Sequence, residues 1–382
     1  MTLSSDSSVL LIGPVPPPVT GQAIAFSLLV EELKKARSIV TADLSEPLGR
    51  RDQQFSLARS IQILRLAKSV IGLIPNASAV YLTIAQSRLG FLRDALFIAI
   101  SCLWQRPVIA HLHGGNYASF YNSESPAMRY LIRKMLRKVK RLIVLSDRLR
   151  HDFDFLGSDF EPRLRTVKNA SNLPRGRPRK APSGKLRLLY LSNLVVEKGY
   201  MDCVYAVAHL RRLLPDVSIK LVLAGTFILG DDQYRTTTEM NTVLRENIRS
   251  LDLEDAIEFS GTVLGEEKVR LLETADIHLL PTYYRNEGQP ITLIEALAAG
   301  LPSVTTRWRD IEDIIADSSA GIFVPPKNPL AVAQAIADLY NDPDGYERMS
   351  KAALLASKQF SPALHVAEIN QLIDEVSQSG LF

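Results

Sequence analysis

Short apolar segments alternate along most of the chain with segments of helical periodicity. In the first half, the apolar segments predict six strands, at residues 8–13, 38–43, 79–84, 107–113, 141–146 and 164–167. The segments between them, such as 21–37, 55–74 and 88–103, carry apolar residues at helical spacing. Near-continuous apolar strands joined by helices are typical of a parallel sheet covered on both faces. The pattern therefore predicts a doubly wound α/β domain.

The alternation stops at PRGRPRKAPSGK, which is dense in proline, glycine and basic residues and predicts a linker. Further strand candidates follow at residues 186–192, 218–225, 257–261, 277–281, 302–305 and 321–324. We therefore expect an N-terminal domain over residues 1–174, a linker over 175–185 and a second domain over 186–360. Since open parallel sheets bind ligands beyond the carboxyl ends of their strands, we expect two tandem Rossmann-like α/β domains whose sheets face an interdomain cleft.

Composition narrows the class of protein. The 382 residues are 46% hydrophobic and 23% charged, which excludes a mainly disordered chain and a coiled-coil rod. Two cysteines, Cys102 and Cys203, exclude a disulfide scaffold and a cysteine-rich zinc site. The longest apolar stretch, 95–104, is well short of the roughly 20 residues of a membrane span, and the start lacks the basic region of a signal peptide. We expect a soluble or peripheral protein of the cytoplasm.

Charge is distributed unevenly along the chain. Residues 1–185 hold 28 basic and 13 acidic residues, a net +15, and residues 186–382 hold 17 and 28, a net −11. The N-terminal half is therefore expected to face an anionic partner, either nucleic acid or a membrane surface. The segment 128–141 is predicted to be a basic amphipathic helix, which suits a membrane surface or a solvated face. Base-stacking aromatic residues and nucleic-acid motifs are missing, so we favour the membrane.

The first motif, GPVPPPVTGQ, follows the first predicted strand. Thr20 is a good N-cap, and Gly21 opens the next predicted helix, whose N-terminus suits a phosphate or another anion. The motif is neither GxGxxG nor GxxxxGK[ST], so nicotinamide and P-loop functions lose support. An ordinary strand-to-helix turn remains an equal alternative.

The second motif, HLHGGNY, follows the fourth predicted strand. Its two glycines let a ligand approach the backbone closely. We expect His113, the last residue before the turn, to contact a ligand, and His111 to be a packed core residue. The pair also resembles a metal-binding His-x-His, but no third ligand accompanies it. Asp152 and Asp154, another pattern that holds metals elsewhere, are predicted to lie on a helix face instead.

The third motif, SNLVVEKGY, follows the first strand of the second domain. A lysine in a glycine-containing loop at a strand end can reach a phosphate as a point charge, which makes Lys198 a candidate. The alternative is a solvated loop lysine, and the motif alone is weak.

The fourth motif, NEGQPITLIEALAAGLP, is the most informative. Pro290 suits the first turn of a short helix that ends at a glycine. Glu287 precedes this helix and Glu295 lies within it, and carboxylates so placed can accept hydrogen bonds from sugar and ribose hydroxyls. The backbone N–H groups of Gly288, Gln289 and the helix start suit a phosphate. The alternative is a capped buried helix with an exposed glutamate.

Together these motifs resemble the retaining family 4 glycosyltransferases of the GT-B fold. The resemblance covers nearly the whole chain and is strongest over residues 186–329, where the two glutamates separated by seven residues are highly specific. The strings GPVPPPVTGQ and HLHGG resemble bacterial members that build surface polysaccharides.

The resemblance implies roles for particular residues. Glu287, with the backbone of Gly288 and Gln289, would contact the donor sugar, and Glu295 would hold the nucleotide ribose. Lys198 would stabilise the leaving diphosphate, aided by helix N-termini and not by a metal or another cofactor. The remaining implied positions are His113 at the donor sugar, Gly21 at the phosphates or acceptor, and Pro290 and Asn193 in the donor site.

One position departs from the family pattern. Many relatives have an arginine in the loop before the lysine, and Asn193 stands there in this sequence. Either Lys198 suffices, another cation such as Arg285 substitutes, or activity is reduced.

The resemblance also implies a function. The chain would transfer sugar, with retention, from a UDP- or GDP-linked donor to a polyprenyl-diphosphate- or lipid-linked surface glycan at the inner face of the cell membrane. The basic first domain would bind that acceptor, and the C-terminal segment 361–382 would pack back on it. The alternatives are a soluble-acceptor transferase, a GT-B relative with other chemistry, and a degenerate nucleotide-sugar-binding subunit.

Overall fold

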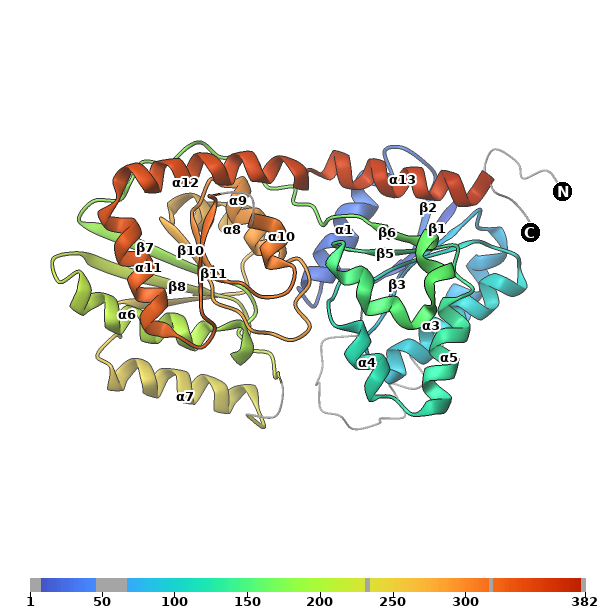
Figure 1. The fold of residues 1–382 in the computed structure, drawn as a ribbon, viewed down its shortest axis with the longest axis horizontal. Helices are drawn as coiled ribbons and strands as arrows, with labels where there is room; N and C mark the ends of the chain where they lie inside the picture. Colours follow the sequence, from blue (N-terminus) through green and yellow to red (C-terminus); the bar gives the residue numbers. More distant parts are fainter. Residues whose placement is uncertain (1–7, 46–66, 231–233, 316–318, 379–382) are drawn as a thin grey trace. The chain divides into compact units, whose positions relative to one another are not determined.

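The computed structural model describes residues 8–45, 67–230, 234–315 and 319–378. The chain forms two compact units: unit 1 holds Met1–Ala170 and Phe360–Phe382, and unit 2 holds Ser171–Gln359. Each unit contains one sheet of six parallel strands with helices on both of its faces (Figure 1). The predicted α/β class, with two tandem doubly wound sheets, is confirmed.

The sheet of unit 1 has the strand order β2-β1-β3-β4-β5-β6. All six strands predicted in the first half are present, with slightly shorter bounds. They are β1 (Val9–Gly13), β2 (Ile39–Asp43), β3 (Val80–Thr83), β4 (Val108–His111), β5 (Arg141–Val144) and β6 (Leu164–Thr166). The chain order reverses at β1, which pairs with β2 on one side and with β3 on the other. Ligands of such sheets bind where the order reverses.

The helices of unit 1 follow the predicted spacing, and the helix predicted over 88–103 has those bounds. They are α1 (Gly21–Leu33), η1 (Ile74–Asn76), α3 (Arg88–Leu103), α4 (Tyr117–Ser123), α5 (Pro126–Leu136), η2 (Arg148–Leu156), η3 (Ser158–Arg163) and α13 (Pro362–Gln378). Of the helix predicted over 55–74, residues 55–66 lie outside the described residues, and 67–73 are helical. The C-terminal α13 packs against α1 within this unit.

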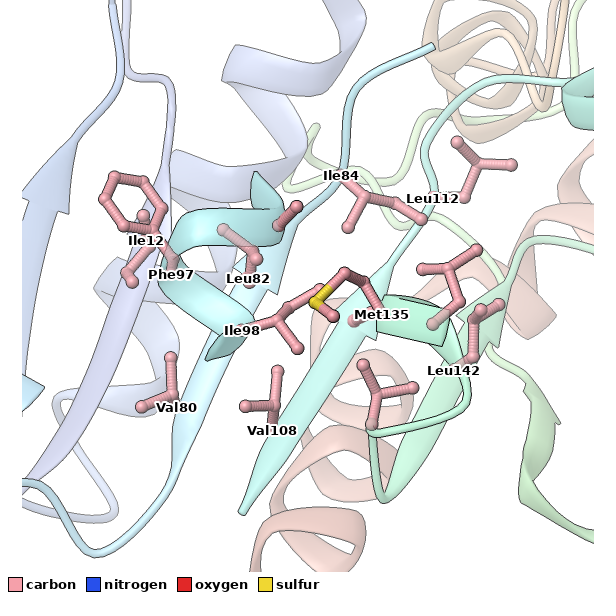
Figure 2. Packing of buried hydrophobic residues seen from close by; sticks show 14 of the residues in the cluster. Ile12, Val80, Leu82, Ile84, Phe97, Ile98, Val108, Leu112, Met135 and Leu142 are labelled. Atoms are coloured by element: carbon pink, nitrogen blue, oxygen red, sulfur yellow. The ribbon is translucent and has the colours of Figure 1, made fainter. Parts of the chain in front are cut away.

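Strand residues of unit 1 enter two cores, because successive side chains point to opposite faces of a sheet. Leu11 of β1 packs on the face covered by α1 and α13, whereas Ile12 packs on the face covered by α3 and α5. Figure 2 shows this second core, where Phe97 of α3 and Met135 of α5 lie among the strand residues. The inner sides of α3 and α5 therefore pack in the core of unit 1.

The predicted basic helix over 128–141 differs from the observed α5. The helix begins earlier because the Ser125 hydroxyl caps its N-terminus, and it ends at Leu136. Its apolar side chains Ile132, Met135 and Leu136 are buried in the core of unit 1. The apolar side of this helix therefore packs against its own domain and is not free to enter a membrane.

Asp152 and Asp154 lie on the 3-10 helix η2. The Asp152 carboxylate accepts a hydrogen bond from the backbone N–H of Tyr117, at the start of α4, at 2.8 Å. Asp154 pairs with the exposed His151 at 3.4 Å. Asp152 therefore stabilises a helix start. Among the residues that the structure describes, no group of three or more His, Cys, Asp or Glu side chains is placed to hold a metal ion.

The sheet of unit 2 has the order β12-β11-β10-β7-β8-β9, and again every predicted strand is present. The strands are β7 (Lys185–Leu191), β8 (Ser218–Ala224), β9 (Ile257–Gly261), β10 (Ile277–Leu280), β11 (Ser303–Thr306) and β12 (Gly321–Val324). The helices are η4 (Val196–Lys198), α6 (Tyr200–Leu213), α7 (Thr237–Ser250), α8 (Gly265–Thr274), α9 (Ile291–Ala298), α10 (Ile311–Ile315), α11 (Pro329–Asn341), α12 (Pro343–Ala356) and η5 (Ser357–Phe360). Within the described parts of the chain, no helix is long and apolar enough to cross a membrane.

The basic segment that composition predicts as a linker lies against unit 2. The Arg179 guanidinium donates hydrogen bonds to the carbonyls of Leu272, Glu273 and Ala275 at the end of α8, and to that of Ala299 after α9, at 2.6–3.1 Å. Helix ends leave such carbonyls without partners, and one planar guanidinium satisfies several of them. The segment therefore packs through hydrogen bonds, which its low apolar content does not reveal.

Replacing Arg179 by alanine is expected to lower the free energy of unfolding of the protein by about 2 kcal/mol, because mostly part-buried carbonyls lose a charged donor. Chemical denaturation measures this change. The exposed Lys180, next in sequence, provides the control, since Lys180→Ala should leave stability within about 0.5 kcal/mol. Equal effects of the two substitutions would contradict the assigned role of Arg179.

The observed division also changes the charge comparison. Unit 1 holds 23 basic and 16 acidic residues, a net +7, and unit 2 holds 22 and 25, a net −3. The difference between the units is smaller than that between the two halves of the sequence, because the basic segment belongs to unit 2 and the acidic α13 to unit 1. Unit 1 remains the basic one.

Candidate functional site

Two of the predicted site residues meet where the chain order of the second sheet reverses. Strand β7 lies between β8 and β10 in that sheet. Lys198 belongs to η4, which follows β7, and Glu287 lies in the loop that follows β10. The carboxyl ends of neighbouring parallel strands lie at the same edge, so loops distant in sequence deliver these side chains to one place.

Lys198 and Glu287 form a shielded ion pair. The Lys198 Nζ lies 3.3 Å from Oε1 of Glu287, and the two side chains are 18% and 7% exposed. The buried Thr282 hydroxyl donates a hydrogen bond to Oε2 of Glu287 at 3.1 Å. The ammonium of Lys198 also lies 5.6 Å from the centre of the Tyr284 ring. Both charges are therefore fixed in direction and position at the edge of the sheet.

Glycines allow these loops to approach one another. Gly199 follows Lys198 in a left-handed conformation, with φ of 79°, and a Cβ atom there would lie 2.4 Å from the carbonyl oxygen of Pro281. A Cβ on Gly225, after β8, would lie 1.9 Å from the carbonyl oxygen of Ser192. No side chain larger than hydrogen fits at either position, so the two glycines set the close packing that brings Lys198 to Glu287.

Glu295 occupies a separate buried position on α9. Its side chain is 2% exposed, and its Oε1 lies 2.5 Å from Nζ of Lys268 on α8. Its second oxygen, Oε2, is buried and has no hydrogen-bond partner among the described residues. Burial raises the pKa of Glu295, and Lys268 opposes that shift. An unpartnered oxygen on a paired carboxylate is a ready acceptor for a hydroxyl group of a ligand.

The other predicted donor residues surround these two glutamates. Gly288, Gln289 and Pro290 are buried between Glu287 and the first turn of α9. Pro290 is the N-cap residue of α9, and no side chain caps that helix start. Asn193 contributes its backbone carbonyl, which accepts a hydrogen bond from the Tyr190 hydroxyl at 3.1 Å. This contact positions the loop and supplies no positive charge.

The groups around Lys198, Glu287 and Glu295 are suited to bind both phosphates and hydroxyls. They comprise an oriented ammonium, a carboxylate beside it, an uncapped helix N-terminus and a second carboxylate with an unpartnered oxygen. Ammonium groups and helix N-termini bind phosphate oxygens, and carboxylates accept hydrogen bonds from hydroxyls. A ligand with phosphates and several hydroxyls matches this set.

In unit 1, three histidines from distant parts of the chain form a buried cluster. The rings of His111 and His113 stack with centroids 4.0 Å apart, and the ring of His365 on α13 lies 6.4 Å from that of His111. Nδ1 of His111 lies 2.5 Å from the Tyr81 hydroxyl, and Nδ1 of His365 lies 2.7 Å from the Lys168 carbonyl, to which it donates. His111 is fully buried at the end of β4, in agreement with its prediction as a core residue.

His113 is an uncharged group in this setting. Its residue surface is partly exposed, but both ring nitrogens are buried. Burial, followed by the neighbouring His365, lowers the pKa of His113 to about 3, and a hydrogen bond with Asn169 acts in the opposite direction. A neutral imidazole offers one donor and one acceptor, so His113 is suited to hydrogen-bonding a hydroxyl and not to neutralising a phosphate.

The loop after β1 begins the next helix as predicted. The Thr20 hydroxyl accepts a hydrogen bond from the backbone N–H of Ala23 at 3.1 Å and caps α1. Gly21 is exposed, and a Cβ atom there would meet no protein atom within 4 Å. Packing within the chain therefore does not require glycine at position 21. The structure leaves Gly21 open to a ligand without assigning one.

Acidification is expected to destabilise the protein through His113. The unfolded chain binds a proton at this residue below a pH of about 6.5, whereas the folded state does not until about pH 3. Stability therefore falls as pH drops through this window. The melting temperature of His113→Gln, measured from pH 7 to pH 4, should fall less steeply than that of the wild type. The exposed His151 is the control, and His151→Gln should follow the wild type.

Sequence reasoning missed three residues that complete these clusters. Lys268 has no motif around it, and only the fold brings it from α8 to Glu295 on α9. Thr282 lies two residues after the buried strand β10, a position that would have signalled it. His365 lies far along the chain and reaches the histidine cluster because α13 packs in unit 1.

Comparison with known proteins finds a family match within the second unit. Residues 176–355 match the model of the family described as "Glycosyl transferases group 1". The chain is 24% identical over 265 residues to glycogen synthase of Mycobacterium tuberculosis, covering 67% of this chain and 60% of that protein. It is 25% identical to an alpha-D-kanosaminyltransferase of Streptomyces kanamyceticus, covering 67% of each chain. It is 29% identical to the putative colanic acid biosynthesis glycosyltransferase WcaL of Escherichia coli, covering 42% of this chain and 37% of that one. The chain thus spans only part of the length of several curated relatives.

Solved structures resemble nearly the whole chain. HepE of Anabaena, crystallised with UDP and glucose, has a TM-score of 0.74 at 16% identity and covers 97% of this chain and 100% of its own. Sucrose-phosphate synthase of Thermosynechococcus elongatus has a TM-score of 0.70 at 15% identity, covering 98% and 100%. The fold is therefore GT-B, which confirms the expected architecture.

Proposed function

We propose that this chain is a glycosyltransferase with a nucleotide-sugar donor, because residues 176–355 match the group 1 glycosyl transferase family model and the chain has a GT-B fold. The observation that carries the proposal is the Lys198–Glu287 pair at the reversal point of the second sheet, with Glu295 on the following helix. The resemblance to the family 4 enzymes in these same residues supports it, as do relatives named as transferases of this group.

Each charged group has a proposed task. Lys198 and the uncapped start of α9 bind the diphosphate. They stabilise the negative charge that develops on it as the bond between the donor sugar and the diphosphate breaks. Glu287 accepts hydrogen bonds from the donor sugar, and Glu295 accepts one from the ribose through Oε2. His113 hydrogen-bonds the sugar as a neutral imidazole. We further propose that transfer retains the anomeric configuration and requires no metal.

For the acceptor we propose a lipid-linked glycan, of the polyprenyl-diphosphate or another lipid type, at the inner face of the cell membrane. The basic charge of unit 1 and the resemblance of its two motifs to surface-polysaccharide enzymes support this class. A soluble acceptor is the alternative. Turnover measured with a lipid-linked acceptor, compared with turnover measured with a soluble glycan acceptor in the absence of detergent, distinguishes the two classes.

The decisive first experiment is a thermal-shift screen with UDP, GDP, ADP and dTDP and their common sugar conjugates, each with and without EDTA. A ligand that binds only the folded state raises the melting temperature. One base is expected to stabilise the protein strongly and equally in both conditions. No shift with any nucleotide would contradict the nucleotide-sugar donor, and Asn193→Arg would be the first change to make. A shift abolished by EDTA would overturn metal independence, and NMR of the product anomer tests retention.

A further inference from the structure

Helix α3 of unit 1 carries an exposed apolar stripe on the side opposite to the core. Leu89, Leu92, Leu96 and Leu103 recur at intervals of three, four and seven residues, which places them on one side of a helix. They are 61%, 40%, 43% and 79% exposed, and Trp104, directly after the helix, is 51% exposed. We call these five residues the α3 stripe.

The α3 stripe is unusual for a helix with an apolar core face. The opposite side of α3 already supplies Phe91 to the core of unit 1, together with Phe97 and Ile98 (Figure 2). Helices that are apolar all round are normally buried all round. Both charges in the middle of the helix, Arg93 and Asp94, pair with each other, and the Asp94 side chain is fully buried. The outer side of α3 is therefore apolar enough to be covered by a binding partner.

Positive charge lies beside this stripe. Helix α5 packs against α3, and Arg133, Lys134 and Lys138 on and just after α5 are exposed. Within the described residues, these three cations form no salt bridge. Burial raises the pKa of the Cys102 thiol on α3, and the nearby Lys138 and Lys140 oppose that shift, so Lys138, one of the three exposed cations, lies close to the end of the stripe.

We propose that the α3 stripe and the adjacent cations of α5 dock unit 1 on an anionic lipid surface. Leucine side chains and Trp104 enter the boundary between headgroups and acyl chains, and the cations of α5 contact the anionic headgroups. Neither helix suffices alone, because the apolar side of α5 is used in the core and the outer side of α3 carries no free charge. A second copy of the chain fits less well, since a symmetric contact would bring the basic faces together.

The role of this docking rests on one part of the proposed function, namely that the acceptor is lipid-linked. Docking through α3 would hold unit 1 at the surface in which such an acceptor resides. Vesicle binding itself, however, requires neither donor nor turnover. The two proposals therefore fail separately: the nucleotide-induced thermal shift reports on the donor site of unit 2, and vesicle binding reports on α3.

The test is co-sedimentation of the full chain with vesicles of phosphatidylglycerol and phosphatidylethanolamine, compared with vesicles of phosphatidylcholine alone. The wild type should bind the anionic vesicles, more weakly as salt rises. Leu96→Asp/Leu103→Asp should weaken binding by about tenfold or more while keeping the melting temperature and the nucleotide-induced shift. The matched control is Leu330→Asp/Leu355→Asp in unit 2, whose leucines are 54% and 63% exposed and whose loss should not change binding.

A charge variant separates the two parts of the surface. Arg133→Gln/Lys134→Gln should lower binding to anionic vesicles by about fivefold for each charge removed. Absence of wild-type binding to anionic vesicles would overturn the proposal. So would a dimer in solution that Leu96→Asp/Leu103→Asp converts to a monomer, because the stripe would then be covered by a second copy. A fall of many degrees in the melting temperature of that variant would also overturn it, since the stripe would then be packed within the chain.

Discussion

Replacing Glu287 by glutamine is expected to reduce turnover of the nucleotide sugar by about 100- to 1000-fold. The carboxylate is 7% exposed and is held by Lys198 on one oxygen and by Thr282 on the other. Glutamine keeps the shape but loses the charge, so the donor sugar loses its anionic hydrogen-bond acceptor. Steady-state kinetics with the donor identified by thermal shift measures the effect.

Binding data give this prediction a second readout. The diphosphate contacts of Lys198 do not need the Glu287 carboxylate, so Glu287→Gln should bind the free nucleoside diphosphate at least as tightly as the wild type. The exposed Glu267 at the start of α8 is the control, and Glu267→Gln should keep full turnover. Turnover of Glu287→Gln within threefold of the wild type would remove Glu287 from the proposed donor site.

Replacing Lys268 by methionine is expected to cost about 3–5 kcal/mol of unfolding free energy at pH 7, because it leaves the Glu295 carboxylate buried without its partner. The side chains are 13% and 2% exposed, so little water is available to solvate the remaining charge. Burial already raises the pKa of Glu295. The folded state therefore takes up a proton more readily than the unfolded state, and the loss of stability should shrink as pH falls.

A double variant distinguishes this charge effect from lost packing. Lys268→Met/Glu295→Leu removes both charges and should recover most of the stability lost in Lys268→Met, whereas its nucleotide binding should be weakened because Glu295 is absent. The surface pair Arg249–Glu254, with side chains 74% and 60% exposed, gives the matched control. Arg249→Met should change stability by less than about 1 kcal/mol. Equal losses in Lys268→Met and Arg249→Met would contradict the burial argument.

The strands and their grouping into two sheets could be predicted because each strand is a local signal. Fully buried parallel strands are continuous apolar segments, and their residues, such as those of β1 and β7, reveal burial on both faces. Lys198, Glu287 and Glu295 could be proposed for the same reason, since each lies in the loop after a predicted strand or within a short predicted helix. Their pairing could not be predicted, because it depends on β7 and β10 being neighbours in the sheet.

The features that sequence analysis did not reveal share a physical cause, which is that composition does not show where a side chain packs. Arg179 has the composition of a linker, yet it satisfies carbonyls at two helix ends. Helix α5 has the pattern of a membrane-surface helix, yet Ile132 and Leu136 belong to the core. Lys268 is one basic residue among many until α8 and α9 bring it to Glu295.

The order of the two units along the chain has a consequence for biosynthesis. Unit 2 is one continuous stretch, Ser171–Gln359, whereas unit 1 needs α13 from the far end of the sequence. Ile369 and Ile373 of α13 are fully buried against α1 and the first sheet. A ribosome therefore releases every residue of unit 2 before the last helix of unit 1 emerges. The part of unit 1 that is made first is therefore expected to complete its fold after unit 2, because its apolar face stays uncovered, or bound by a chaperone, until α13 emerges.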